Sequence, residues 1–496
     1  MTATPRKRLF RLRPLAALAL GAALLPLGVN GPAHAADADS MPANALAKVM
    51  ADEVTGPGAF RHLEAINKAT LDNGGTRVSG TPGYDASAAY ITSELTKAGY
   101  QVKRQEFEFL DYDILSEQGS VVAPEARTLH PTIARFSVST PDGGLTADLA
   151  QPSGKSTGCS VDDYAGTDVK GKIVLVDVGT DCFITQKQLV LNELGASAML
   201  MNVNSPNPDL NLRYRMVPPT DARIPTGTLS RAESEALRAD AAKGPVSLRL
   251  DLRGNNKMTK TYNLLADTPT GRADNTVVMG AHLDTVDTTA GANDNGAAAA
   301  MVLETALKLA PHRNQVKNRV RFAWWSAEEK GLSGSQFYVD QLTPEQRKQT
   351  ALYLNLEMIA SPNFARQVYN GQTATGPAPA GSEQISKLVN GYFADRHLPT
   401  VPLILDGRSD HSPFITAGIP AGGVNAGADT VKSQEWADLF GGTAGQMLDP
   451  CYHQACDTLD HVNKTIFDQN GRSMAWAVGR FAVDTSDING AAASQQ

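Results

Sequence analysis

From about residue 256 onward, short apolar segments alternate with longer amphipathic segments, and this alternation limits the folds open to the chain. The short segments have the length and residue types of strands, and the longer ones have helical periodicity. Strands separated by helices pair in parallel, with helices on both faces of the sheet. We therefore predict an α/β fold with a mostly parallel central sheet flanked by helices. The predicted strands are 275–281, 318–326, 351–357 and 419–425, and the predicted helices are 297–310, 336–342, 382–396 and 467–485.

The chain has 496 residues, which is too long for one ordinary core. Predicted helices at 41–54, 57–72 and 85–98 and a strand at 101–109 extend the α/β pattern to the N-terminal side. Between 135 and 255 the sequence changes to short β-rich runs punctuated by proline and glycine, with one predicted helix at 186–196. We predict the following divisions: signal peptide 1–35, N-terminal part of the α/β domain 36–134 with room for a short propeptide, β-rich insert 135–255, the rest of the α/β domain 256–485, and a C-terminal tail 486–496.

The first 35 residues have the pattern of a secretory signal peptide. Five basic residues precede an Ala/Leu-rich core, and Ala33-His34-Ala35 is a small-residue cleavage site. A membrane anchor is the alternative, but Pro26 and Gly28 interrupt a core that is already short. We predict a secreted, extracellular protein.

Charge excludes two classes of partner. Removing the leader leaves 40 basic against 52 acidic residues, a net charge near −12, and no basic run remains outside the leader. This composition argues against nucleic acid and against an anionic membrane surface as partners. We expect a monomer.

Four cysteines in an exported chain are expected to form disulfides. Cys159 and Cys182 lie in the insert, and Cys451 and Cys456 lie near the C-terminus. Three pairings are possible, and proximity along the chain favours one disulfide within each region.

Histidines and acids follow several of the predicted strands. Parallel strands place their carboxyl ends at one edge of the sheet, so these groups are expected to converge. The candidates are His282, Asp294, Glu328, Glu329, Glu357 and His453. Imidazole and carboxylate without thiolate suit zinc, and two histidines with three carboxylates suit two ions that share one carboxylate. The alternative, in which each acid is a helix cap or a surface charge, is weak for Glu328 and Glu329, because adjacent acids after an apolar strand are costly to bury unpaired.

Two other hydrolytic patterns fail. Gly331–Ser335 reads GLSGS, but the G-x-S-x-G motif of a nucleophilic serine requires glycine at position 335. No H-E-x-x-H motif occurs, so a helix-borne zinc protease site is excluded.

Four segments in this order resemble the secreted bacterial dizinc aminopeptidases, in the clan of zinc exopeptidases that contains glutamate carboxypeptidase and the transferrin receptor ectodomain. The segments are His282-x-Asp284, Asn293–Gly296, Trp325–Ser335 and Asp449–His453. The resemblance covers roughly residues 55–135 and 256–485, and the insert is similar to a protease-associated domain. It implies hydrolysis of peptides with a free N-terminus, preferably at large apolar residues, and two zinc ions as cofactors, with calcium as a further candidate.

The resemblance also implies a role for each residue. Asp294 would bridge two zinc ions, with His282 and Glu357 completing one site and Glu329 and His453 the other. Asp284 would accept a hydrogen bond from the ring of His282 and so orient it. Glu328 would be the general base, Tyr452 would donate to the developing oxyanion, and the backbone near Arg408 would help to hold the substrate amine.

The chain departs from the family pattern at Glu357, where aspartate is expected. The extra methylene moves the carboxylate by up to ~1.5 Å, about one bond length. In the family this acid also helps to bind the substrate amine, so a carboxypeptidase or dipeptidase with the same zinc site stays open as an alternative. A non-enzymatic binding protein on this fold is a separate alternative.

Overall fold

A computed structural model describes residues 41–490 except 180, 206 and 217. The predicted signal peptide and the last six residues of the predicted tail lie outside the described residues. The start of the predicted tail forms a short helix, α13 (Ser486–Asn489). No helix in residues 41–490 combines the length and the apolar character that spanning a bilayer requires.

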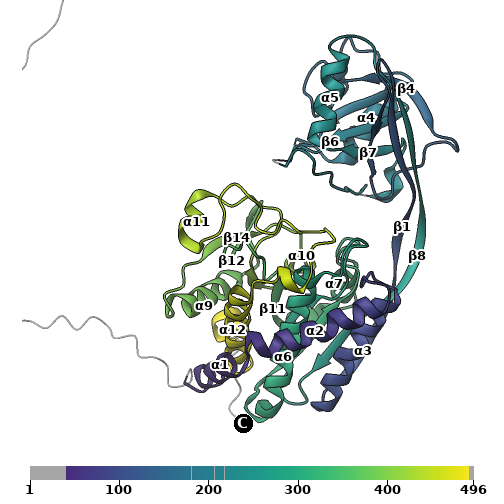
Figure 1. Ribbon diagram of the computed structural model, residues 1–496. Coiled ribbons are helices and arrows are strands. Elements are labelled where there is room, and N and C mark those ends of the chain that lie inside the picture. The colour runs from purple at the N-terminus through teal and green to yellow at the C-terminus, as the bar shows by residue number, and fades with distance from the viewer. Residues whose placement is uncertain (1–40, 180, 206, 217, 491–496) are drawn as a thin grey trace, which may run out of the picture. The chain divides into compact units, whose positions relative to one another are not determined.

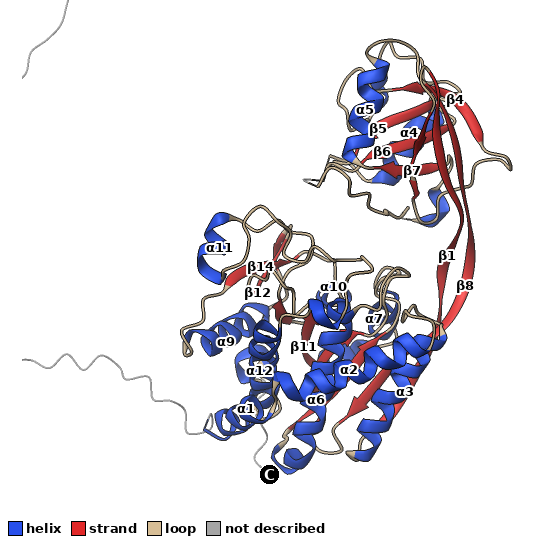
Figure 2. Ribbon diagram, viewed as in Figure 1, coloured by secondary structure: helices blue, strands red, loops and turns tan. Residues whose placement is uncertain are grey.

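The α/β domain is built on the predicted sheet (Figures 1 and 2). Its strand order is β12-β15-β11-β9-β10-β8, and β15, β11, β9 and β10 run parallel. The bounds are β8 (Ser247–Asp267), β9 (Arg272–His282), β10 (Asn318–Trp325), β11 (Thr350–Glu357), β12 (Gln367–Thr373), β13 (Gly376–Pro377), β14 (Val401–Leu405) and β15 (Ala421–Asn425). The sheet is therefore mostly parallel, as predicted, with antiparallel pairs β10–β8 and β12–β15 toward its sides.

Helices cover both faces of the sheet, because residues along each strand alternate between two apolar clusters. The larger cluster joins Met279, Phe322 and Leu354 to α2, α3, α6 and α12, whereas the smaller one joins Val278, Trp325 and Tyr353 to α7 and α10. The bounds of the helices are α1 (Met41–Glu53), α2 (Gly56–Asp72), α3 (Pro82–Lys97), α6 (Ala298–Leu309), α7 (Ser333–Asp340), α8 (Pro344–Gln349), α9 (Ser382–Ala394), α10 (His411–Thr416), α11 (Gln434–Phe440) and α12 (Lys464–Phe481). Alanines on α6 let this helix lie close to the sheet: the Trp324 indole N–H donates to the Ala299 carbonyl at 2.9 Å.

The insert is attached through two long antiparallel strands, β1 (Gln101–Ala123) and β8. The first of these continues beyond residue 109, where the predicted strand ends, and the predicted insert boundary at 255 lies within β8. The insert contains β2 (Arg127–Leu129), β3 (Thr132–Ile133), β4 (Leu145–Ala150), β5 (Ile173–Asp177), β6 (Ala198–Asn202), β7 (Thr226–Leu229), α4 (Ile184–Glu193) and α5 (Arg231–Ala241). Its apolar clusters begin at Tyr112 and include Leu252, so its packing extends along both long strands. The prediction of one helix in the insert was wrong, because α5 is a second one.

Both favoured disulfides are present. Cys159 is bonded to Cys182 and Cys451 to Cys456. The second disulfide joins two cysteines that are five positions apart and closes a short loop. His453 lies within this loop, so the disulfide restrains its backbone.

Candidate metal centre

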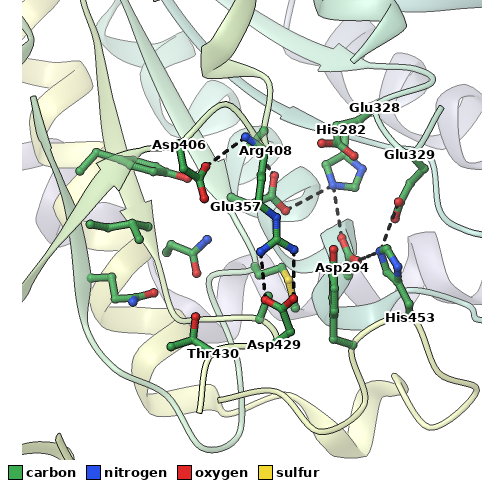
Figure 3. A pocket seen from close by; sticks show the side chains of 18 residues that line it. His282, Asp294, Glu328, Glu329, Glu357, Asp406, Arg408, Asp429, Thr430 and His453 are labelled. Carbon is green, nitrogen blue, oxygen red and sulfur yellow. Dashed lines mark hydrogen bonds and ion pairs between the residues drawn. The ribbon is translucent and has the colours of Figure 1, made fainter. Parts of the chain in front are cut away.

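The predicted site residues meet at the carboxyl ends of the parallel strands (Figure 3). His282 is the last residue of β9, Glu357 is the last residue of β11, and Glu328 and Glu329 follow β10. The register aligns these ends, because Trp325 of β10 pairs with His282 and β11 pairs with β9 on the other side. Fold topology alone therefore brings groups 75 residues apart in sequence into contact.

Asp294 lies at the centre of the cluster and uses its two carboxylate oxygens on opposite sides. Oδ1 is 3.3 Å from His282 Nε2, and Oδ2 is 3.2 Å from His453 Nε2. The same ring nitrogens are 3.3 Å from Glu357 Oε1 and 3.2 Å from Glu329 Oε2. Two groups of three potential ligands result, with Asp294 common to both, and within each group the ligand atoms lie within 4.8 Å of one another.

The chemistry of this donor set fits two divalent cations. His282 and Asp294 are 1% and 3% exposed, and Oε1 of Glu329 is buried with no hydrogen-bond partner among the described residues. Burying several carboxylates so close together is costly unless positive charge accompanies them. Zinc accepts imidazole nitrogen and carboxylate oxygen at these positions. The cluster therefore has the composition, spacing and excess negative charge that a pair of zinc ions requires.

The protonation of the cluster reflects the same crowding. Burial by itself lowers the pKa of His282, but the carboxylates of Glu357 and Glu328 outweigh it and raise this pKa well above 6.5. His453 behaves alike, with Glu329 and Asp294 as the opposing acids. Burial favours the neutral form of Asp294, yet hydrogen bonds from both histidines hold its pKa well below the usual value. Positive charge is thus stabilised at both histidine positions.

Glu328 and Tyr452 line the pocket but belong to neither group of ligands. Burial raises the pKa of the Glu328 carboxyl well above 4.5, and the neighbouring acids Glu329 and Asp410 add to this rise. Tyr452 stacks on the ring of His453 with a centroid distance of 3.8 Å, and burial raises its pKa as well. A carboxyl with a high pKa and a neutral phenol are groups that can exchange and donate protons near a reacting carbonyl.

Asp284 differs from the expectation in its contacts. Nδ1 of His282 lies 3.0 Å from the backbone carbonyl of Asp284 and 3.7 Å from its carboxylate. The carboxylate instead accepts the backbone N–H groups of Glu328 at 3.1 Å and Glu329 at 3.3 Å. Residue 284 therefore orients the imidazole through its main chain and positions the Glu328–Glu329 turn through its side chain.

Arg408 lines the same pocket, and its guanidinium forms a two-pronged ion pair with Asp429 at 3.1 and 3.2 Å. The next residue, Ser409, donates its hydroxyl to Glu357 Oε2 at 2.6 Å. The 408–409 turn is thus attached to one of the potential ligands, close to where the sequence predicted contacts with the substrate amine.

Sequence reasoning missed two residues that hold the centre. Asp457 accepts the backbone N–H groups of Asn293 at 2.7 Å and Asp294 at 3.0 Å. In the sequence, only its position directly after Cys456, close to His453, indicates that Asp457 belongs to the site.

Arg77 is the second missed residue. It is fully buried and donates to the backbone carbonyls of Leu283, Ala290 and Gly291, in the loop that joins His282 to Asp294. Burial lowers the pKa of Arg77 to about 10, and the nearby acids Asp457, Asp284 and Asp294 oppose the shift. Arg77 therefore combines loop positioning with a permanent positive charge under the acidic cluster.

Comparison with known proteins identifies the family and the fold. The model of peptidase family M28 matches residues 263–478, and that of the PA domain matches residues 145–237. A probable lipoprotein aminopeptidase of Mycobacterium tuberculosis is 37% identical over 93% of this chain and 90% of its own length. The chain belongs to peptidase family M28.

Two further proteins that are similar to this M28 peptidase are also named aminopeptidases. Leucine aminopeptidase 2 of Arthroderma otae is 36% identical over 82% of this chain and 80% of its own length. The crystal structure of a zinc aminopeptidase from Bacillus subtilis matches with a TM-score of 0.66 and 25% identity, covering 86% of this chain and 95% of that one. The family resemblance predicted from the four motifs, including the protease-associated insert, is confirmed.

Proposed function

We propose that this M28 peptidase is an exported two-zinc aminopeptidase that removes the N-terminal residue of peptides. The observation that carries the proposal is the position of Asp294 between two matched pairs, each made of one histidine and one glutamate. Relatives that are named aminopeptidases, one of them a zinc enzyme, support the activity. The signal peptide proposed for residues 1–35 and the two disulfides support export.

His282, Asp294 and Glu357 would hold one zinc ion, and Asp294, Glu329 and His453 the other. Bound zinc lowers the pKa of a coordinated water and polarises a carbonyl oxygen. Glu357 reaches this position despite its extra methylene, since Oε1 lies 3.3 Å from the same nitrogen of His282 that approaches Asp294. The glutamate is therefore compatible with the ligand role that the family gives to aspartate.

The remaining chemistry belongs to side chains of this chain. Glu328 accepts a proton from the attacking water and returns it to the leaving amine, which needs a carboxylate beside the water. The Tyr452 hydroxyl donates to the carbonyl oxygen as negative charge develops there. Such an interaction is worth roughly 3 kcal/mol when the donor is already in place. Glu357 and the turn at Arg408 and Ser409 surround the position of the substrate amine.

A comparison of free and N-acetylated peptides tests this assignment. Acetylation removes the ammonium group that faces Glu357, and losing one partner of a buried charged pair costs about 2 kcal/mol or more, which is at least roughly 30-fold in rate. We expect free leucyl peptides to lose their first residue and acetylated ones to be hydrolysed at least about 30-fold more slowly. Release of the C-terminal residue from acetylated peptides would instead identify a carboxypeptidase. A zinc-loaded protein that hydrolyses neither series would identify a binding protein.

A further inference from the structure

The pocket extends past the metal centre into a region whose walls come from β12, β14, β15 and the following loop. The residues that line this region are Met358, Gln367, Tyr369, Leu403, Asp406, Asn425 and Thr430. It adjoins Glu357 and the turn at Arg408, where the substrate amine is proposed to bind. The side chain of the N-terminal substrate residue is therefore the group that this region would receive.

Gln367 contributes a buried polar group to the wall. It is 3% exposed and lines the pocket. An amide that lines a pocket can bond to water or to a ligand, and a ligand that displaces the water without bonding to the amide loses that interaction. A purely apolar substrate side chain would cover this amide without bonding to it, whereas a side chain with a polar end can donate to its oxygen.

Charge in this region is unbalanced. Two acids lie outside the metal centre, and one of them, Asp429, is matched by both prongs of Arg408. The other, Asp406, accepts the backbone N–H of Arg408 at 3.0 Å, and no cationic side chain forms an ion pair with it in the described part of the chain. The Arg408–Asp429 pair is neutral as a whole, so the carboxylate of Asp406 gives this region a net negative charge.

Apolar surface lies in the same region. Met358 is buried next to Glu357 in sequence, and Leu403 and the ring of Tyr369 add further carbon atoms to the lining. A long side chain with a methylene stem and a charged end can use both kinds of surface, because its stem packs on carbon while its end stays near polar groups.

We propose that this region selects an N-terminal residue with a long, positively charged side chain, lysine or arginine, and that Asp406 is the residue that determines the preference. The inference rests on the proposed aminopeptidase function and replaces the large apolar preference implied by the family resemblance. Gln367 accepts a second hydrogen bond from the charged end of the substrate. Asp406 acts on binding through its charge and takes no part in the bond cleavage.

Lysyl and norleucyl p-nitroanilides, assayed with the zinc-loaded full chain, test the proposal. Both substrate side chains have the same four-carbon chain, and only the lysyl side chain carries a terminal ammonium group. We expect kcat/KM for the lysyl substrate to exceed that for the norleucyl substrate by about fivefold or more, as for one charge-assisted hydrogen bond. In Asp406→Asn the ratio should fall to about 1, because the isosteric amide carries no charge. In Asp395→Asn, which removes an exposed charge at the end of α9 away from the pocket, the ratio should keep its wild-type value.

Each other outcome contradicts a defined part of the account. A norleucyl substrate hydrolysed as fast as the lysyl one, or faster, by the wild type would overturn the charge preference and restore the apolar one. A wild-type ratio that persists in Asp406→Asn would overturn the assignment to Asp406. Hydrolysis of neither substrate would count against the proposed aminopeptidase function itself.

Discussion

Replacing Glu328 with glutamine is expected to lower kcat by about 10²–10⁴-fold, the usual contribution of a general base, while the zinc content stays at its wild-type level. Glutamine has nearly the same shape but cannot accept the proton of the attacking water. Glu328 belongs to neither group of potential ligands, so the donor atoms for the metals are unchanged in the variant. Steady-state kinetics and metal analysis of one preparation measure both quantities.

Two matched variants make the Glu328 result specific. Glu329→Gln changes the neighbouring acid, whose Oε2 lies 3.2 Å from His453 Nε2, and it should lose zinc as well as activity. Glu345→Gln, in the first turn of α8, changes an exposed acid and should alter neither. If Glu328→Gln kept its activity within a few-fold, the base would have to be another group. If it lost zinc together with activity, Glu328 would be a ligand.

Arg77→Leu is expected to destabilise the α/β domain by about 3–5 kcal/mol, the range for breaking a buried charged cluster by removing one partner. The substitution leaves the carbonyls of Leu283, Ala290 and Gly291 without their donors. It also removes the buried positive charge near Asp284, Asp294 and Asp457. Urea unfolding followed by tryptophan fluorescence measures the change, since Trp324 and Trp325 are buried in the sheet next to this loop.

Lysine and a surface arginine provide the controls for Arg77. Arg77→Lys keeps the charge but lacks the planar fork that reaches several carbonyls, so it should recover only part of the lost stability. Arg61→Leu removes an exposed arginine of α2 and should change stability by less than about 0.5 kcal/mol. A stability of Arg77→Leu equal to that of Arg61→Leu would contradict the role of Arg77 in holding the loop between His282 and Asp294.

The sheet and the positions of the site residues were accessible from sequence because both depend on local patterns. The strand ending at His282 and the strand ending at Glu357 are rich in apolar residues and buried along most of their length, as expected for parallel strands covered on both faces. Once these strands are placed in one parallel sheet, their carboxyl ends must meet, so the convergence of His282 and Glu357 follows from topology.

The residues that hold the metal ligands in place could not be predicted from the sequence, because they contact segments that are far away along the chain. Arg77 lies more than 200 residues before the carbonyls that it binds, in a segment that reads as an ordinary loop ahead of a helix. Asp284 shows a second limit: its residue type suggested a carboxylate bonded to the imidazole, whereas its backbone carbonyl makes that contact. Which atom of a residue is used depends on backbone direction, and a residue pattern does not specify it.

Gln367 and Asp406 illustrate a third limit. Neither belongs to a recognisable motif, and each is significant only because β12 and the segment after β14 bring them to one pocket. In the proposed function, substrate preference depends on the packing of the strands beside the metal centre, where the family motifs carry no information.

Anomalous scattering at the zinc edge from crystals of the zinc-loaded protein tests the central claim most directly. The account predicts two peaks per chain, roughly 3.5–4 Å apart, as in two-metal hydrolytic sites. Asp294 should lie between them, with His282 and Glu357 on one ion and Glu329 and His453 on the other. A single peak, or two peaks that do not share Asp294, would contradict it.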